Sequence, residues 1–319
     1  MTKRRIFILS LLTAGAIVAA AACSNAASPP RATPASSGCL VGKKPAATSC
    51  RVLRNDSGHL RDPSGLWGKV DCVKRSRQHR VIGGGDRWSR ADGRRQGNRS
   101  YRRLTVYDGD DNWGERCELA RNEHRKGGRG GRGTFNLYRE GETRITQMSV
   151  RLPRSYRLNS SKWQVVSQMK QTQPAANGSG SSVIGLSARR GRWELTQSTS
   201  VLGSDNARIL WAAPAHKRTW TRISLVVTYS QDPSKGSIRI FADRNGDGDV
   251  RDRRERSRLI HTYTLKRETT GGRADGIDPG ESIPSHLRVG IYHDTALHCP
   301  KPRGCSVDID NVQVAAPSR

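Results

Sequence analysis

The stretch Ser285-His286-Leu287-Arg288-Val289-Gly290-Ile291-Tyr292-His293 alternates aliphatic residues with polar ones. Successive side chains of a β-strand point to opposite faces, so one face carries the aliphatic residues and the other carries Arg288 and Tyr292. Gly290 lies between these two long side chains, and we expect it to leave the backbone open to a ligand. The stretch therefore predicts a strand with a core face and a functional face.

Two further segments show the same arrangement. Residues 114–119 place Arg116 and Glu118 on one face of a strand, and residues 163–171 place Gln164, Gln168 and Lys170 together on another. Arginine and lysine bind anions, and amides add hydrogen bonds. Three strands that offer these groups on one side indicate a sheet that binds an anionic molecule.

The fold class follows from the rest of the chain, which lacks long segments with helical periodicity. Alternating segments recur instead, near residues 144–152, 222–229, 237–242 and 306–314, and they are separated by turns rich in Gly, Pro, Asn, Asp and Ser. Many short alternating strands predict an all-β protein, either a β-sandwich or a barrel. Only 34% of the residues are hydrophobic and 5% aromatic, so the predicted core is modest.

The net charge of the chain indicates which class of molecule it binds. The net charge is +28, and arginines outnumber lysines by 44 to 12, with a dense basic segment at residues 74–103. Such a surface attracts polyanions, although an arginine-rich but merely solvated surface is the alternative. For an exported protein, an acidic polysaccharide is a more natural polyanion than nucleic acid. We therefore expect an acidic polysaccharide, and no nucleic acid, as the partner. Separately, we expect the protein to be a monomer.

The N-terminus predicts export. Residues 1–22 combine a basic start with an apolar run and small residues, as a signal peptide does. Residues 23–50 are a low-complexity spacer rich in Ala, Ser, Pro and Thr, and Cys23 is a candidate for lipid attachment, which is left open. We expect a secreted or extracytoplasmic protein, with any membrane contact limited to that anchor. Residues 51–100 would form a basic extension that packs on or leads into a folded domain at residues 101–319.

Cysteine usage fits this compartment. Without Cys23, six cysteines remain, an even number suited to three disulfides. Cys299 and Cys305 close a short loop and form the best local pair. The pairs Cys39–Cys50 and Cys72–Cys117 are guesses among the many pairings that six cysteines allow.

An acidic loop follows one predicted strand. Asp243-Arg244-Asn245-Gly246-Asp247-Gly248-Asp249 begins like a calcium-binding loop, whose oxygen ligands alternate along the chain. The ligands would be Asp243, Asn245, Asp247 and Asp249, and the ion would be structural. Arg254 occupies the twelfth position, where such loops have Glu, so Asp252 or Glu255 would complete the shell. A solvated hairpin tip without metal is the alternative.

Taken in order, these segments resemble the jelly-roll polysaccharide lyases. The closest likeness is to the heparin lyase I-like group, with echoes of glucuronan and alginate lyases, and it extends from Tyr101 to Val314. The segments that carry it are 103–110, 115–119, 168–171, 243–249, 285–292 and 307–312. The resemblance implies a jelly-roll, concanavalin-like β-sandwich of two antiparallel sheets, and an enzyme that cleaves a uronate-containing polymer by β-elimination.

The resemblance also implies roles for residues. Arg116 and Gln168 would hold the substrate carboxylate, Glu118 would orient Arg116, and Gln164 would add a substrate contact. Tyr292 would transfer the proton, with Lys170 or Arg288 tuning it, because nearby cations favour the phenolate.

The chain departs from the family pattern at two positions, with Arg288 where Lys is common and Lys170 where His is common. Arginine carries protons poorly, and lysine acts as a base only when its pKa falls. The general base is therefore left unassigned. The same departures admit a second hypothesis, a non-catalytic carbohydrate-binding sandwich for anionic glycans. An ordinary polar sheet surface is the third.

Overall fold

The computed structural model describes eleven stretches of the chain, namely residues 50–56, 67–73, 78–83, 100–111, 114–121, 137–171, 182–198, 207–247, 249–250, 252–267 and 279–317. The expected signal peptide, the anchor at Cys23 and the pairing of Cys39 with Cys50 lie outside these residues. Within the described stretches, no helix is long and apolar enough to cross a membrane.

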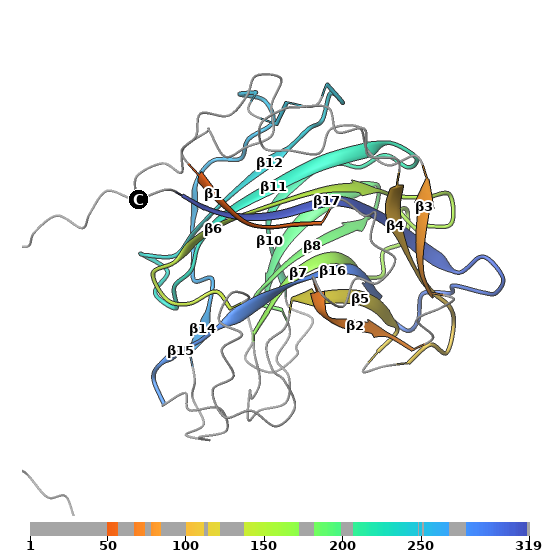
Figure 1. Ribbon diagram of the computed structural model, residues 1–319, viewed down its shortest axis with the longest axis horizontal. Coiled ribbons are helices and arrows are strands. Elements are labelled where there is room, and N and C mark those ends of the chain that lie inside the picture. Colours follow the sequence, from red (N-terminus) through yellow and green to blue (C-terminus); the bar gives the residue numbers. More distant parts are fainter. Residues whose placement is uncertain are drawn as a thin grey trace, which may run out of the picture. The chain divides into compact units, whose positions relative to one another are not determined.

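The described elements form two large sheets and one small one (Figure 1). The eight-stranded sheet contains β1 (Cys50–Asp56), β3 (His79–Gly83), β4 (Ser100–Val106), β6 (Thr143–Arg151), β11 (Trp220–Thr228), β12 (Ser237–Ala242), β13 (Ile260–His261) and β17 (Cys305–Pro317). The seven-stranded sheet contains β2 (Gly68–Cys72), β5 (Arg116–Arg121), β7 (Gln164–Gln171), β8 (Ile184–Arg189), β9 (Arg192–Ser198), β10 (Ala207–Pro214) and β16 (Ser285–His293). The two-stranded sheet pairs β14 (Lys266–Arg267) with β15 (Ser282–Ile283).

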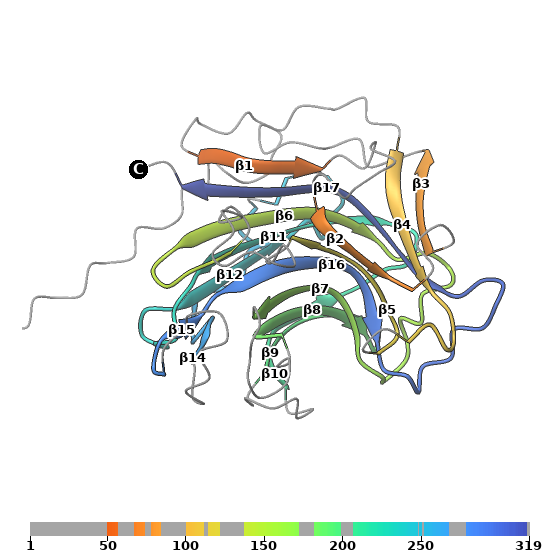
Figure 2. The same cartoon turned by 60° about the horizontal axis from the view of Figure 1, so that its bottom comes forward.

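The two large sheets face each other as layers (Figure 2). Their orders are β13-β12-β11-β6-β17-β4-β3, with β1 also paired to β17, and β10-β9-β8-β7-β16-β5-β2. Neighbouring strands are antiparallel, as in the central pairs β16–β5 and β16–β7. The seven-stranded sheet curves so that its concave face turns away from the other layer. This arrangement confirms the predicted all-β sandwich of two antiparallel sheets.

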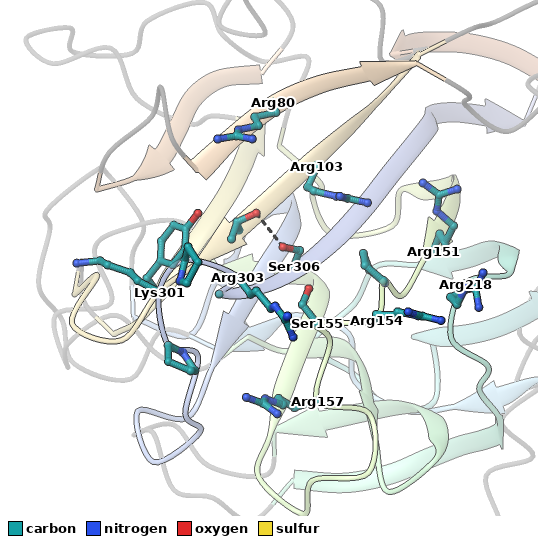
Figure 3. A pocket seen from close by; sticks show the side chains of 16 residues that line it. Arg80, Arg103, Arg151, Arg154, Ser155, Arg157, Arg218, Lys301, Arg303 and Ser306 are labelled. Atoms are coloured by element: carbon teal, nitrogen blue, oxygen red, sulfur yellow. Dashed lines mark hydrogen bonds between the residues drawn. The ribbon is translucent and has the colours of Figure 1, made fainter.

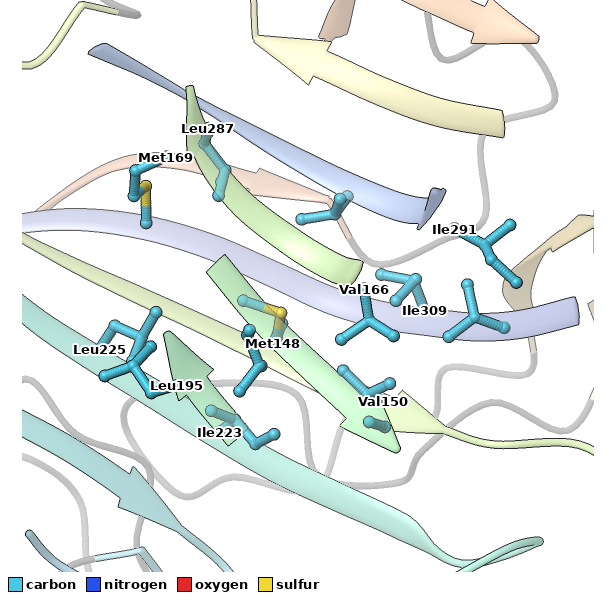
Figure 4. Packing of buried hydrophobic residues seen from close by; sticks show 14 of the residues in the cluster. Met148, Val150, Val166, Met169, Leu195, Ile223, Leu225, Leu287, Ile291 and Ile309 are labelled. Atoms are coloured by element: carbon cyan, nitrogen blue, oxygen red, sulfur yellow. The ribbon is translucent and has the colours of Figure 1, made fainter. Parts of the chain in front are cut away.

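The core lies between the layers because alternate residues of both sheets point inward. Figure 4 shows aliphatic and methionine side chains of the two sheets meeting there. The labelled members of this cluster are Met148, Val150, Val166, Met169, Leu195, Ile223, Leu225, Leu287, Ile291 and Ile309, each at most 2% exposed. The aliphatic face predicted for β16 therefore lies in the core between the layers, and so do Met148 and Val150 of β6 and Ile223 and Leu225 of β11.

The described strands of the basic extension belong to the sandwich. β1 pairs with β17, β3 pairs with β4, and β2 pairs with β5. The Cys72–Cys117 disulfide links β2 to β5, and the Cys299–Cys305 disulfide closes the loop that leads into β17. Both sequence-predicted bridges between described residues are thus present, and the first of them fixes β2 at the edge of the concave sheet.

Candidate active site

Three adjacent strands bring the predicted functional residues onto the concave face. In the ladders of β16 with β5 and β7, Tyr292 is the partner of Arg116 and Arg288 is the partner of Gln168. Paired residues of an antiparallel ladder point to the same face. The intervening side chains, such as Cys117 and Ile291, lie in the core. The prediction that Arg116, Glu118, Gln168, Lys170, Arg288 and Tyr292 share one face is consistent with this register.

Glu118 is the centre of a buried polar cluster, with an exposed fraction of 1%. Its Oε1 accepts a hydrogen bond of 2.5 Å from Gln168 Nε2. Its Oε2 lies 3.4 Å from Nη1 of Arg288 and 3.6 Å from Nη1 of Arg116. One carboxylate therefore orients an amide and two guanidinium groups. Several such contacts are needed to offset the free energy that is lost when a charged pair is removed from water.

Asp71 is a second carboxylate in this cluster, and the sequence reasoning missed it. Its Oδ2 accepts a hydrogen bond of 2.9 Å from Arg288 Nη1, and Asp71 is the ladder partner of Glu118. Arg288 Nε also donates to His286 Nε2 at 3.1 Å. Arg288 is thus held on several sides. The one available signal for Asp71 was the guessed Cys72–Cys117 bridge, because that bridge places β2 beside β5.

Tyr292 is only partly buried, and its ring is enclosed by three neighbours. The guanidinium carbon of Arg116 lies 3.9 Å from the ring centroid. Trp163 meets the ring edge-on, with 4.7 Å between centroids. Gly114 has a φ of +93°, and a Cβ there would lie 2.8 Å from Cε2 of Tyr292. A larger residue at this position would displace the tyrosine, so Gly114 and Trp163 join the site as positioning residues that sequence reasoning did not identify.

Lys170 is also partly exposed. Burial and the positive charges of Arg288 and Arg116 lower the pKa of Lys170 to about 8, while Glu118 and Asp71 act in the opposite direction. The ammonium form is disfavoured because two guanidinium groups are already close. A lysine with this pKa is partly neutral near physiological pH and can accept a proton.

Gln164 does not share the functional face, so that part of the prediction was wrong. The register of β7 shifts between Val165 and Ser167 against β8, and a matching shift occurs against β16. A bulge of this kind reverses the alternation. Gln164 therefore pairs with core-facing His293, is fully buried, and donates to the carbonyl of Arg157 at 2.9 Å. Gln164 is therefore a structural residue at the start of β7.

Gly290 does not leave its backbone open to a ligand as expected. A Cβ at this position would lie 2.3 Å from the carbonyl oxygen of Cys117 and 2.7 Å from the Cα of Glu118. Its φ of +149° is also one that other residues rarely adopt. Glycine is needed here because β5 approaches β16 closely, and this approach brings Glu118 against Arg288.

The acidic loop lies apart from this cluster and gathers three carboxylates. Ligand oxygens of Asp243, Asp247 and Glu255 lie within 4.8 Å of one another. Glu255 is 4% exposed; its Oε1 accepts the backbone N–H groups of Arg244 and Asn245, while its buried Oε2 has no hydrogen-bond partner among the described residues. Burial raises the pKa of Glu255, and Asp243 and Asp247 add to that effect.

Charge and geometry at this loop fit a divalent cation. Arg222 Nη1 donates to Asp243 Oδ2 at 2.6 Å and offsets one of the three negative charges. The Asn245 side-chain oxygen accepts the N–H of Asp247, and Asp249 is not one of the three converging carboxylates. Oxygen-only donors are those that calcium prefers.

The chain is similar in sequence and in fold to known polysaccharide lyases. A family model described as polysaccharide lyase matches residues 83–312. The solved endo-β-1,4-glucuronan lyase from the fungus Trichoderma reesei is similar, with a TM-score of 0.51 and 15% identity over 84% of this chain and 96% of that chain. A marine alginate lyase from Aplysia kurodai gives 0.48 and 12% over 84% of this chain and 100% of that one. No curated protein matches the sequence.

Proposed function

Because this chain belongs to the polysaccharide lyase family, we propose that it cleaves a uronate-containing acidic polysaccharide by β-elimination on the concave sheet. The observation that carries the proposal is the cluster around Glu118. There, two oriented arginines, a glutamine, a lysine of lowered pKa and a tyrosine share one face.

Substrate binding begins with the uronate carboxylate. Elimination requires that this group stabilise negative charge that develops at C5, so cationic and hydrogen-bonding groups must neutralise it. Arg116 and Gln168 supply those groups. Glu118 orients both of them and does not itself react, because an additional anion would repel the substrate carboxylate. Arg288 is held by Asp71 and Glu118 and adds positive potential without moving a proton.

Two proton transfers remain. Lys170 in its neutral form takes the proton from C5, for which a pKa of about 8 is suited. The electron pair of the C5–H bond forms the C4–C5 double bond, and the C4–O4 bond breaks. The Tyr292 hydroxyl donates a proton to the leaving O4. Trp163, Gly114 and Arg116 fix the ring in the position that this transfer requires.

The family and the sequence also support where the enzyme works and what holds it together. We propose an exported monomer in which residues 1–22 are removed and Cys23 is a candidate anchor, since acidic polysaccharides of this kind are extracellular. Calcium held by Asp243, Asp247 and Glu255 would stabilise the loop after β12. It lies outside the catalytic cluster and supplies no step of the reaction.

A non-catalytic carbohydrate-binding protein is the second candidate. The feature that favours it is that Arg288 and Lys170 stand at the two positions where the resemblance to the lyases leads us to expect Lys and His. A binding protein would use the same cationic face without turnover.

A substrate panel tests the proposal. Polyglucuronate, alginate, polygalacturonate and sulfated glycosaminoglycans are incubated with the protein, and the ultraviolet absorbance of unsaturated uronate is followed. Formation of unsaturated uronate from at least one polyuronate supports the proposal that the protein is a lyase. Binding to a polyuronate without any unsaturated product favours the binding protein.

A further inference from the structure

A second basic surface lies on the other side of the sandwich, on the outer face of the eight-stranded sheet. Arg103, Thr105, Arg151 and Ser306 come from β4, β6 and β17, and each alternates with a core residue of its strand. The walls are formed by Arg80, Tyr107, residues 153–155, Arg157, Arg218 and residues 300–304. They enclose a cavity of about 1160 Å³, which exceeds the roughly 1,000 Å³ upper range of small-molecule pockets and suits an extended ligand. We call it the basic groove.

Its lining is strongly cationic. Figure 3 shows the basic side chains that line it. They are Arg80, Arg103, Arg151, Arg154, Arg157, Arg218, Lys301 and Arg303, and the described lining contains no Asp or Glu. Asp308, beneath them, is fully buried and already shared by Arg103 Nε at 2.7 Å and Arg151 Nη2 at 2.9 Å. Among the described residues, most of this positive charge is therefore not balanced by a carboxylate.

The floor of the groove is preorganised. The Arg151 guanidinium lies 4.6 Å from the ring centroid of Tyr101 and 4.8 Å from that of Trp220, and the two rings meet edge-on at 5.5 Å. The Thr105 and Ser306 hydroxyls are hydrogen-bonded to each other at 2.8 Å. Asp308 engages Nε and Nη2 of both Arg103 and Arg151, so the net positive charge of these three residues is fixed in position at the floor. Exposed Arg80, Arg154 and Arg303 surround this fixed floor.

We propose that the basic groove is a second, non-catalytic binding site for an acidic polysaccharide, which holds one part of the polymer while another part occupies the concave sheet. This inference rests on the proposed function for the identity of the polymer. Binding at two places raises the effective concentration of the chain at the catalytic face.

The lining favours a polyuronate over nucleic acid. Single-stranded nucleic acids are bound by aromatic side chains on which bases stack. Tyr107 is the one aromatic residue among the described lining residues, and it is only 9% exposed. The rings of Tyr101 and Trp220 are covered by Arg151. Repeated guanidinium groups with few available rings match a polymer with repeated carboxylates.

The experiment compares two triple variants of the full chain. The groove variant carries Arg80→Gln, Arg154→Gln and Arg303→Gln. The control carries Arg139→Gln, Arg256→Gln and Arg258→Gln, which removes three other exposed arginines outside the groove lining. Calorimetry measures binding of long polyglucuronate, with Tyr292→Phe present in both variants and in the parent to prevent cleavage. The activity of the concave face is measured separately, in variants that retain Tyr292. The substrate is a short glucuronate oligosaccharide, or a short oligosaccharide of the polyuronate identified in the substrate panel.

We expect the groove variant to bind the long polymer about tenfold or more weakly than the parent. The affinity of the control variant should change by about twofold or less. Turnover of the short oligosaccharide should be unchanged in both variants. Equal weakening in both variants, or none in the groove variant, would overturn the inference. The inference would also be overturned if the groove variant lost binding to a single-stranded oligonucleotide but retained its affinity for polyglucuronate. If no polymer is cleaved but the difference in binding persists, the proposed catalysis fails and the groove stands.

Discussion

The guanidinium carbon of Arg116 lies 3.9 Å from the centroid of the Tyr292 ring, and the two residues are ladder partners in adjacent strands β5 and β16. One strand pair therefore fixes the group that would bind the carboxylate relative to the group that would transfer the proton. Because the sheet backbone sets this relationship, removing the Tyr292 hydroxyl can change the chemistry while the ring contacts with Arg116 and Trp163 remain.

Tyr292→Phe removes only the hydroxyl. We expect kcat to fall by roughly two orders of magnitude or more while polymer binding is retained, because the proton donor is lost and the ring contacts remain. Steady-state kinetics and calorimetry together measure the two effects. The matched control is Tyr229→Phe, whose buried hydroxyl has no hydrogen-bond partner among the described residues and lies in the core. Tyr292→Phe with wild-type kcat would reject this role.

The pH dependence distinguishes two roles of Lys170. If the neutral amine is the base, kcat/KM rises with pH and levels off above about 8, the lowered pKa of Lys170. If Lys170 acts only as a cation, kcat/KM falls through the same region. In Lys170→Gln, we expect the rate to fall by about 100-fold and the rising limb near pH 8 to disappear. A falling profile would assign Lys170 to binding.

Lys170 should also destabilise the fold at neutral pH. Its pKa is about 8 in the folded protein and 10.5 ordinarily, so the unfolded chain binds more protons between these values. Stability therefore increases as pH rises through that window. We expect Lys170→Gln to raise the free energy of unfolding by roughly 1–2 kcal/mol at pH 7, with the gain fading between pH 8 and 10.5. Urea unfolding at several pH values measures it, and a loss of stability would contradict the account.

Gly290→Ala tests the close contact of β5 and β16. The new Cβ would lie 2.3 Å from the Cys117 carbonyl oxygen, so we expect a loss of at least about 2 kcal/mol in stability and reduced activity. Gly141→Ala is the control, because Gly141 has a φ of +78° but no atom within 4 Å of the added Cβ. It should cost only about 1 kcal/mol. Equal costs would show that backbone conformation alone explains the glycine.

Calcium should stabilise the loop after β12. We expect a chelator to lower the melting temperature. Saturating calcium should then raise the free energy of unfolding by about 2–3 kcal/mol. Glu255→Gln should remove this response, whereas Asp252→Asn, at an exposed carboxylate outside the converging set, should preserve it. A melting temperature indifferent to chelator, or a response lost only in Asp252→Asn, would contradict this ligand set.

Alternation along single strands was enough to predict much of the fold and the site. It placed Arg116 with Glu118, and Arg288 with Tyr292, because a regular strand has a period of two residues. It failed at Gln164, since the bulge near Val166 comes from the pairing of β7 with its neighbours and leaves no mark in the local sequence.

The remaining misses depend on contacts between distant segments. Asp71 is 217 residues from Arg288, and its role follows from sheet order. The need for glycine at Gly290 follows from the backbone of β5. Likewise, Arg103, Arg151 and Asp308 form the groove floor only when β4, β17 and β6 are adjacent.

The masses of the products test the central claim most directly. A polyuronate oligosaccharide of defined length is digested, and the products are weighed by mass spectrometry while ultraviolet absorbance is recorded. Elimination predicts product pairs whose masses sum to that of the substrate, with one member absorbing through its new double bond. Product pairs that together are heavier by one water molecule, and without this absorbance, would show hydrolysis and contradict the account.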